Sequence, residues 1–284
     1  MAEVRSGRRP WTFYALAAFF TLFVLFLYGP MSAIYILSFQ GPNGGLTFPL
    51  NGVSLNWFYA LFQQQRTGDI AGSFVRSIAL ALIVLVLTVA ISVMAGLAFR
   101  RRFVGAGVLF YIAIASLIMP GLLVSLGIGL MFQFLGIKTN WYTSALGAHL
   151  TWTLPFGLLI MFAVFSRFNR AYEEAARDLG AGRWAILSTI VLPILLPGMI
   201  AVALFGFTLS YDEFPRTSIA VGPSNTLPLE IWNMTTNVTS PALYAIGTVT
   251  TAVSFLVIAL ALGSIALIQR RRTRRTLRRV EGGA

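Results

Sequence analysis

Six long apolar runs dominate this 284-residue sequence. A helix rises about 1.5 Å per residue and the hydrocarbon core of a bilayer is about 30 Å thick, so roughly 20 apolar residues can cross a membrane. Backbone groups in lipid must satisfy their own hydrogen bonds, and no alternating barrel pattern is present, so each run is predicted to be helical. The predicted spans are Trp11–Phe39, Arg76–Ala98, Val104–Leu135, Trp141–Phe165, Ile194–Tyr211 and Tyr244–Ile268.

The composition agrees with a membrane protein and disagrees with a soluble domain. Hydrophobic residues make up 57% of the chain and charged residues 11%, whereas soluble domains average about 45–50% and about 25%. We therefore expect an all-α polytopic membrane protein with six transmembrane helices. Its transmembrane domain is expected at 11–269 and includes a long loop at 166–193, with short tails at 1–10 and 270–284.

Basic residues are divided unevenly between the connections, and this predicts the orientation. Seventeen of the 21 lysines and arginines lie on one side: three in the N-terminal tail, three after the second span, four after the fourth and seven in the C-terminal tail. Short loops rich in these residues stay in the cytoplasm. Both termini of this multi-pass protein are therefore predicted to be cytoplasmic. The arginine-rich tail is expected to contact anionic lipid headgroups rather than nucleic acid.

Few side chains are suited to catalysis. Cysteine is absent and His149 is the single histidine, which excludes thiolate sites and multi-histidine metal sites. Lys138 is the single lysine, and it lacks the preceding glycine run of a phosphate-binding loop. We therefore expect no catalytic site, metal or cofactor, and no ATP hydrolysis by this chain. His149 is expected to make structural hydrogen bonds, with a proton relay as the alternative.

The third predicted span contains Met119-Pro120-Gly121 in its middle. Proline removes a backbone donor, and glycine is a poor helix former. Two outcomes stay open at this point of the sequence. The helix is either broken and lines a cavity, as broken helices do in many transporters, or it is simply kinked.

The connection between the fourth and fifth spans has a helix–turn–helix pattern. Alanine and glutamate favour a helix over Tyr172–Leu179. Gly180 and Gly182 indicate a sharp turn, a second short helix is expected to end at Ile190, and Pro193 is expected to open the fifth span. Loops of this length in compact proteins usually have a function or are disordered, and this one is predicted to be structured. It is either a docking surface or an ordinary solvated loop that covers the bundle.

One motif in this loop has seven residues at fixed spacing, which are Glu174, Ala175, Ala176, Gly180, Ile190, Leu192 and Pro193. This motif resembles the EAA motif of the permease subunits of binding-protein-dependent ABC importers. The resemblance implies a type I importer permease in a bacterial inner membrane. This permease would work with an ABC ATPase dimer, a second permease subunit and an extracytoplasmic solute-binding protein. The loop would be the coupling element, with Glu174 in polar contact with the ATPase and Gly180 permitting the turn. Arg183 and Trp184 would lie near the contact.

Two further stretches are informative, and they are Leu209-Ser-Tyr-Asp-Glu-Phe214 and Gly222-Pro-Ser-Asn-Thr-Leu-Pro-Leu-Glu-Ile-Trp-Asn-Met234. Both resemble the second permease subunit of spermidine/putrescine importers. The resemblance implies a polyamine cargo, whose ammonium groups need carboxylates and aromatic faces. The candidate cargo-path residues are Tyr211, Asp212, Glu213, Phe214 and Trp232. The sequence departs from the subfamily at Glu213, where a second aspartate is usual, and at Arg216 just after it.

Other functions stay open. Permeases of the same layout carry iron, thiamine or phosphonates, so another small solute is the main alternative cargo. An ion-driven secondary transporter is a distant alternative, because it would need buried acidic or histidine residues in several spans and an internal repeat. A membrane assembly protein without transport activity is a third alternative. Asp212 and Glu213 also have a plain alternative role, which is to mark the outer end of the fifth span in water.

Overall fold

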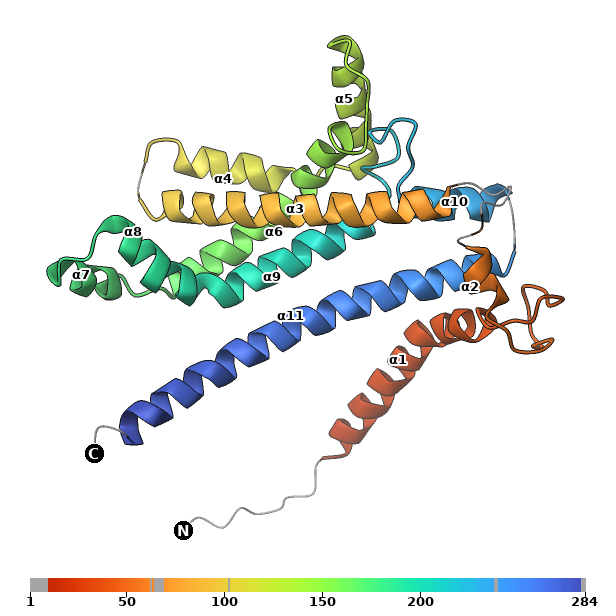
Figure 1. Cartoon of the computed structure of the whole chain (residues 1–284), viewed down its shortest axis with the longest axis horizontal. Coiled ribbons are helices and arrows are strands. Elements are labelled where there is room, and N and C mark those ends of the chain that lie inside the picture. The colour runs from red at the N-terminus through yellow and green to blue at the C-terminus, as the bar shows by residue number, and fades with distance from the viewer. Residues whose placement is uncertain (1–9, 62, 64–68, 102, 238–239, 282–284) are drawn as a thin grey trace. The chain divides into compact units, whose positions relative to one another are not determined.

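The computed structural model describes residues 10–61, 63, 69–101, 103–237 and 240–281 (Figure 1). These residues contain no β-strand, only one isolated bridge between Gln40 and Val53, so the all-α prediction is confirmed. Five of their helices are long and apolar enough to cross a membrane, and two more are apolar but shorter. The elements are α1 (Trp11–Leu37), α2 (Asn56–Ala60), α3 (Ile70–Phe99), α4 (Ala106–Ala115), α5 (Gly121–Phe134), α6 (Ser144–Ser166), α7 (Ala171–Asp178), α8 (Arg183–Ile186), a π-helical turn (Leu187–Val191), α9 (Leu192–Tyr211), α10 (Leu227–Asn237) and α11 (Ala242–Glu281).

The chain forms two units. The first comprises Met1–Thr67 and Met234–Thr251, and the second comprises Gly68–Asn233 and Ala252–Ala284. The most apolar stretches of the candidate spans of α1 and α11 contain no buried residue, whereas Leu37 near the end of α1 and Ala245 and Ile246 near the start of α11 are buried. Apolar helical stretches that are exposed in the chain by itself need lipid or another subunit around them.

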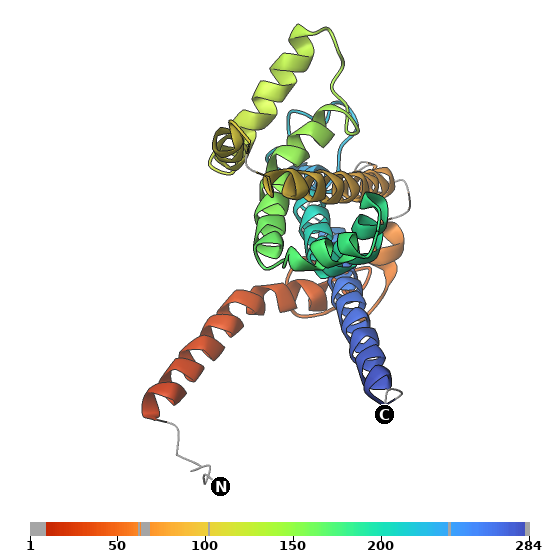
Figure 2. The ribbon, with the colours of Figure 1, turned by 90° about the vertical axis from the view of Figure 1, so that its left-hand side faces the viewer.

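The bundle of α3, α6 and α9 forms the core of the second unit, where the three helices pack side by side (Figures 1 and 2). Small residues let their backbones approach each other. A Cβ on Gly157 of α6 would meet Thr88 and Ser92 of α3, and a Cβ on Gly206 of α9 would also meet Thr88. The hydroxyls of Thr88 and Thr153 share a 2.8 Å hydrogen bond between α3 and α6. Small and hydroxyl-bearing residues of this kind are typical of contacts between membrane helices.

The third predicted span is broken. α4 ends at Ala115, and α5 begins at Gly121 after Pro120. The predicted break is therefore confirmed and a simple kink is ruled out, while the lining of a cavity by the broken helices stays a prediction. Neither helix alone has the roughly 20 residues that cross a bilayer, so the sixth crossing stays a prediction.

α3 begins at Ile70, earlier than the predicted start of the span at Arg76. The Asp69 carboxylate caps the helix by accepting a hydrogen bond from the Gly72 backbone N–H at 2.8 Å. Arg76 then points back and donates to the same carboxylate at 2.9 Å. This hydrogen bond from Arg76 is the main cause that holds the pKa of Asp69 below its ordinary value. A capping aspartate and a basic residue inside the helix therefore extend α3 beyond its apolar stretch.

Pro193 lies in the first turn of α9, as predicted, but no break separates this span from the helix before it. The helix is continuous from Arg183 to Tyr211 and includes the π-helical turn Leu187–Val191. A proline cannot donate the hydrogen bond to the carbonyl four residues earlier. Pro193 directly follows the turn where this ladder of bonds is already shifted, so the helix continues through it. The second helix of the loop is thus rigidly joined to a membrane span.

The C-terminal tail is not a separate segment in the described residues. α11 continues from Ala242 to Glu281 and contains most of the predicted tail. Arginine is a good helix former, so the helix continues through the charged residues that follow the apolar run. The predicted border at 270 therefore marks the end of the apolar run, while the helix extends beyond it.

Candidate functional site

The loop between α6 and α9 turns sharply after α7. The Gly180 N–H donates to the Arg177 carbonyl at 2.8 Å, and the Ala181 N–H donates to the Ala176 carbonyl at 2.9 Å. This pair of bonds is a Schellman cap, which places the residue after the helix in the left-handed region. Gly180 has a φ of 80°. The predicted turn at Gly180 is confirmed, and it sets the angle between α7 and α8.

Gly180→Ala is expected to destabilise this turn by about 1–2 kcal/mol, because an L-residue is strained in the left-handed region. A Cβ would meet no atom at either Gly180 or Gly182, and Gly182 has a φ of −69°. Gly182→Ala is therefore the matched control. Limited proteolysis of the detergent-solubilised chain should cleave the loop several-fold faster in Gly180→Ala than in the control. Equal cleavage of the two variants would contradict the role of the cap.

The EAA-like motif has a buried face and an exposed face. Ala176 is buried in a cluster with Met161 and Phe165 of α6, and Ile190 and Leu192 pack against the same cluster. The motif residues on the exposed side are Glu174, Ala175, Gly180 and Pro193, and the neighbouring Arg183 and Trp184 are exposed as well. The buried face fixes the loop to the bundle, and the other face is exposed.

Two large apolar side chains stand out at the exposed end of the loop. Trp184 is 75% exposed and Leu179 is 89% exposed. Large apolar side chains exposed on a charged loop, outside the apolar spans, are candidates for contact with a partner protein. Trp184 was a sequence candidate, but Leu179 was missed. The available signal was a leucine directly before the glycine cap of a short, highly charged helix.

A clamp around Arg100 holds α7 against the bundle, and sequence reasoning missed it entirely. Arg100 Nη1 donates to Glu173 Oε1 at 2.7 Å, and both side chains are largely buried. Arg170 Nη2 donates to the Arg100 carbonyl at 2.6 Å. The Arg100 guanidinium lies 4.8 Å from the Phe168 ring centroid and 5.4 Å from that of Phe165. These five residues, the Arg100 clamp, join α3, α6 and α7.

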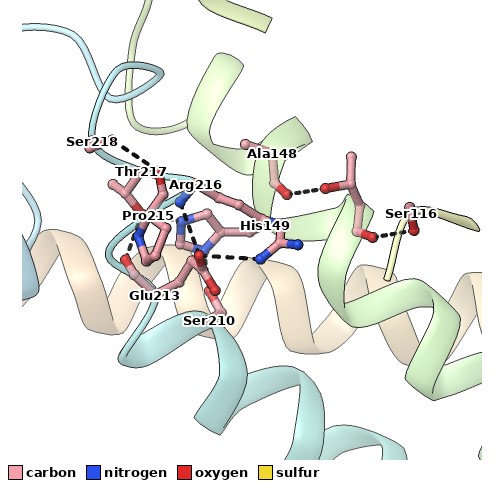
Figure 3. A network of polar contacts seen from close by, with 10 residues as sticks. Ser116, Ala148, His149, Ser210, Glu213, Pro215, Arg216, Thr217 and Ser218 are labelled. Carbon is pink, nitrogen blue, oxygen red and sulfur yellow. Dashed lines mark hydrogen bonds and ion pairs between the residues drawn. The ribbon is translucent and has the colours of Figure 1, made fainter. Parts of the chain in front are cut away.

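The acidic pair after α9 divides into one exposed and one buried carboxylate. Glu213 is 7% exposed, and its Oε1 accepts a hydrogen bond from the Arg216 backbone N–H at 3.0 Å (Figure 3). The Arg216 guanidinium lies 3.5 Å from the same oxygen and 4.2 Å from the Trp152 ring centroid. Asp212 is exposed and forms no ion pair with any described residue. Only Asp212 therefore presents an uncompensated charge.

His149 forms the centre of the buried polar network behind this pair (Figure 3). Its Nδ1 is 2.8 Å from Ser210 Oγ, and its Nε2 is 2.8 Å from Thr217 Oγ1. The Thr217 hydroxyl in turn donates to the Glu213 carbonyl at 2.6 Å. The expected hydrogen-bonded histidine is confirmed, and it connects α6, α9 and the loop that follows α9.

The break before α5 positions the same loop. A Cβ on Gly121 would meet Pro215 Cβ at 3.1 Å and Arg216 Nη1 at 3.2 Å. One turn further along, Ser125 Oγ accepts hydrogen bonds from the backbone N–H groups of Ile219 and Ala220 at 3.0 and 3.1 Å. The broken span therefore supports the loop that carries Asp212 and Glu213.

The aromatic candidates also divide between the interior and the surface. Tyr211 is 1% exposed, and its ring stacks on Phe207 with centroids 5.6 Å apart. Trp232 is 55% exposed, and its ring centroid lies 5.5 Å from that of Phe214. Asp212, Phe214 and Trp232 are thus the candidates that reach the surface, while Tyr211 and Glu213 belong to the interior.

Known proteins resemble this chain over most of its length. It is 28% identical over 255 residues to the spermidine/putrescine transport system permease protein PotC of Haemophilus influenzae, which covers 88% of this chain and 95% of the relative. It is 27% identical to the putrescine transport system permease protein PotI of Escherichia coli, over 85% of each chain. A crystal structure of a bacterial alginate ABC transporter superposes with a TM-score of 0.67 at 16% identity, over 88% of this chain and 92% of that one.

A family model matches residues 88–275, and its description is binding-protein-dependent transport system inner membrane component. The match contains the whole helix–turn–helix loop and the core bundle from the second half of α3 onward. It also contains the acidic pair after α9. Since the matched region is more than half of the sequence, the chain belongs to the family of inner membrane components of binding-protein-dependent transport systems.

Proposed function

We propose that this permease imports a polyamine such as spermidine or putrescine. The observation that carries the proposal is the similarity to PotC and PotI, which spans nearly the whole of this chain and of both relatives. A solute-binding protein would deliver the cargo from outside the membrane. A second permease subunit would supply the other half of the path, and a separate ABC ATPase dimer would hydrolyse ATP.

The loop after α9 offers suitable chemistry for such a cargo. An ammonium group is bound by carboxylates through charge-assisted hydrogen bonds and by aromatic rings through cation–π contact. Asp212 supplies an exposed carboxylate, and Phe214 with Trp232 supplies an aromatic pair in contact. The charge of Glu213 is neutralised by Arg216, so we assign the contact with cargo to Asp212. Arg216 does not favour an anionic cargo, because it is 5% exposed and already paired.

Uptake by membrane vesicles tests the cargo. Vesicles that contain this chain with its partner proteins should accumulate labelled spermidine or putrescine only when ATP is supplied. An excess of unlabelled polyamine should abolish the signal, whereas thiamine or a phosphonate should not. ATP-dependent uptake of a different solute, with no uptake of polyamine, would refute the polyamine proposal while leaving the importer in place.

Asp212→Asn is expected to raise the KM for polyamine uptake about tenfold or more, since a hydrogen bond to a charged group contributes about 1.5–3 kcal/mol. Glu213→Gln is the companion variant one residue away. It leaves Arg216 buried without its carboxylate partner, so it should lower the amount of folded protein with little change in KM. The measurement is uptake as a function of cargo concentration, normalised to protein in the membrane. An unchanged KM in Asp212→Asn would remove this residue from the cargo path.

The coupling role of the loop is part of the same proposal. The exposed face with Glu174, Leu179 and Trp184 would dock on the ATPase, and the rest of the loop is fixed to the bundle. Because α8 continues into α9 as one helix, a displacement of the docked tip would move a membrane span directly. Rigid helices and packed interfaces transmit such movements between two discrete arrangements.

A further inference from the structure

A basic cavity of about 550 Å³ lies between the end of α3 and α7. Its apolar wall is formed by the last turn of α3, and its polar wall by the start of the loop. The charged residues that line it are Arg100, Arg101, Arg170, Arg177, Glu173 and Glu174. Four arginines against two glutamates give this cavity an excess of positive charge.

Arg101 and Arg170 account for the excess positive charge, because the other two arginines face a glutamate. Nitrogen atoms of Arg100 and Arg177 lie 2.7 and 3.6 Å from the carboxylate oxygens of Glu173. Arg170 donates to a backbone carbonyl, and neither Arg170 nor Arg101 forms an ion pair with a carboxylate in the part of the chain that the structure describes. Two guanidinium groups are therefore available to an anion that enters the cavity.

An apolar cavity of about 250 Å³ adjoins the basic one. Its walls include the rings of Phe99, Phe162, Phe165 and Phe168, and it shares Arg100 and Arg170 with the basic cavity. The four rings come from the ends of α3 and α6 and from the residues that follow α6. Both of these helices are apolar enough to cross a membrane. The two cavities thus lie where the spans end, with the aromatic walls next to the charged one.

We propose that the paired cavities bind one anionic phospholipid of the surrounding membrane. The phosphate would lie between Arg101 and Arg170, because basic pockets at the ends of membrane helices bind anionic headgroups. An acyl chain would extend along the four phenylalanine rings. A soluble phosphate or nucleotide would use the arginines but leave the aromatic cavity empty, which is why the lipid is the better fit. The bound headgroup would contact the Arg100 clamp, so anionic lipid would support the position of α7.

Native mass spectrometry of the full chain in detergent tests the site with two added lipids, phosphatidylglycerol and phosphatidylcholine. The wild-type chain should retain the anionic lipid in clear preference to the neutral one. Arg101→Gln should weaken retention of phosphatidylglycerol about fivefold, which corresponds to the loss of one basic residue near an anionic headgroup. Arg167→Gln is the matched control, because Arg167 is exposed near the same end of α6 but lines neither cavity.

A soluble competitor separates the two sources of phosphate. Glycerol phosphate carries the phosphate but no acyl chain, so it should not displace phosphatidylglycerol from the wild-type chain. Displacement by glycerol phosphate would overturn the lipid assignment in favour of a soluble anion. Equal retention of the two lipids, or identical retention by Arg101→Gln and Arg167→Gln, would overturn the site itself. Circular dichroism of Arg101→Gln confirms that the helices are intact before either comparison is made.

Discussion

Arg100→Glu is expected to reduce ATP-driven uptake about a hundredfold, and Arg100→Glu combined with Glu173→Arg is expected to recover much of that loss. The single change places two carboxylates against each other in the largely buried Arg100 clamp. Breaking a buried ion pair by changing one partner costs about 3–5 kcal/mol. A free-energy cost near the lower end of this range would reduce the population of molecules with α7 correctly placed by about a hundredfold.

Uptake and ATP hydrolysis should be measured together on the same reconstituted transporter. If the clamp transmits movement between α7 and the bundle, the single variant loses more transport than ATP hydrolysis, and the double variant restores the ratio. Arg167→Glu reverses a charge near the same end of α6 without touching the clamp, and it should transport normally. Full activity of the Arg100→Glu single variant would show that the pair does not hold α7 in place.

Leu179→Glu and Trp184→Glu are each expected to release the ATPase subunit from the membrane complex. Both side chains are among the most exposed large apolar residues of the second unit, at 89% and 75%. Tryptophan is a frequent hot spot of protein interfaces, where truncation costs about 2 kcal/mol or more, equivalent to about thirtyfold in affinity. A buried charge adds a desolvation penalty to that loss. The affinity of the ATPase for the tagged permease, measured by copurification, should therefore fall at least about thirtyfold.

Tyr142→Glu provides the control for these two variants. Tyr142 is also a large exposed side chain, at 52%, but it lies in the connection before α6, at the end of that helix opposite to α7. The control variant should retain the ATPase and its activity. Normal copurification of the ATPase with both Leu179→Glu and Trp184→Glu would move the docking surface away from the tip of the loop.

Patterns that are local in sequence predicted much of this protein correctly. Long apolar runs identified the five full-length spans, because the length of a membrane helix is set by the bilayer. The glycine after a polar helix identified the turn at Gly180, since the cap depends on backbone conformation at one residue. Pro120 and Gly121 marked the break between α4 and α5. In each case the decisive physics lies within one continuous segment of the chain.

Contacts between distant residues were beyond the reach of sequence patterns. Arg100 and Glu173 lie 73 residues apart, and no spacing rule connects the end of one span to a loop after another. The acidic pair illustrates the same limit. Asp212 and Glu213 are neighbours in sequence, but tertiary packing exposes one and buries the other against Arg216. Pro193 shows a third case, in which the helix before the proline continues into α9 through a π-helical turn instead of ending.

Site-specific crosslinking tests the central claim, that the tip of the loop docks on a separate ATPase. The natural chain has no cysteine, so a single Leu179→Cys creates one attachment point for a short bifunctional reagent, and Lys138→Cys creates a control point in the connection between α5 and α6. We expect Leu179→Cys to crosslink the permease to the ATPase subunit in membranes, and we expect no crosslink from Lys138→Cys. Absence of the crosslinked product from Leu179→Cys, in membranes where the ATPase still copurifies and uptake is intact, would contradict docking at the tip of the loop.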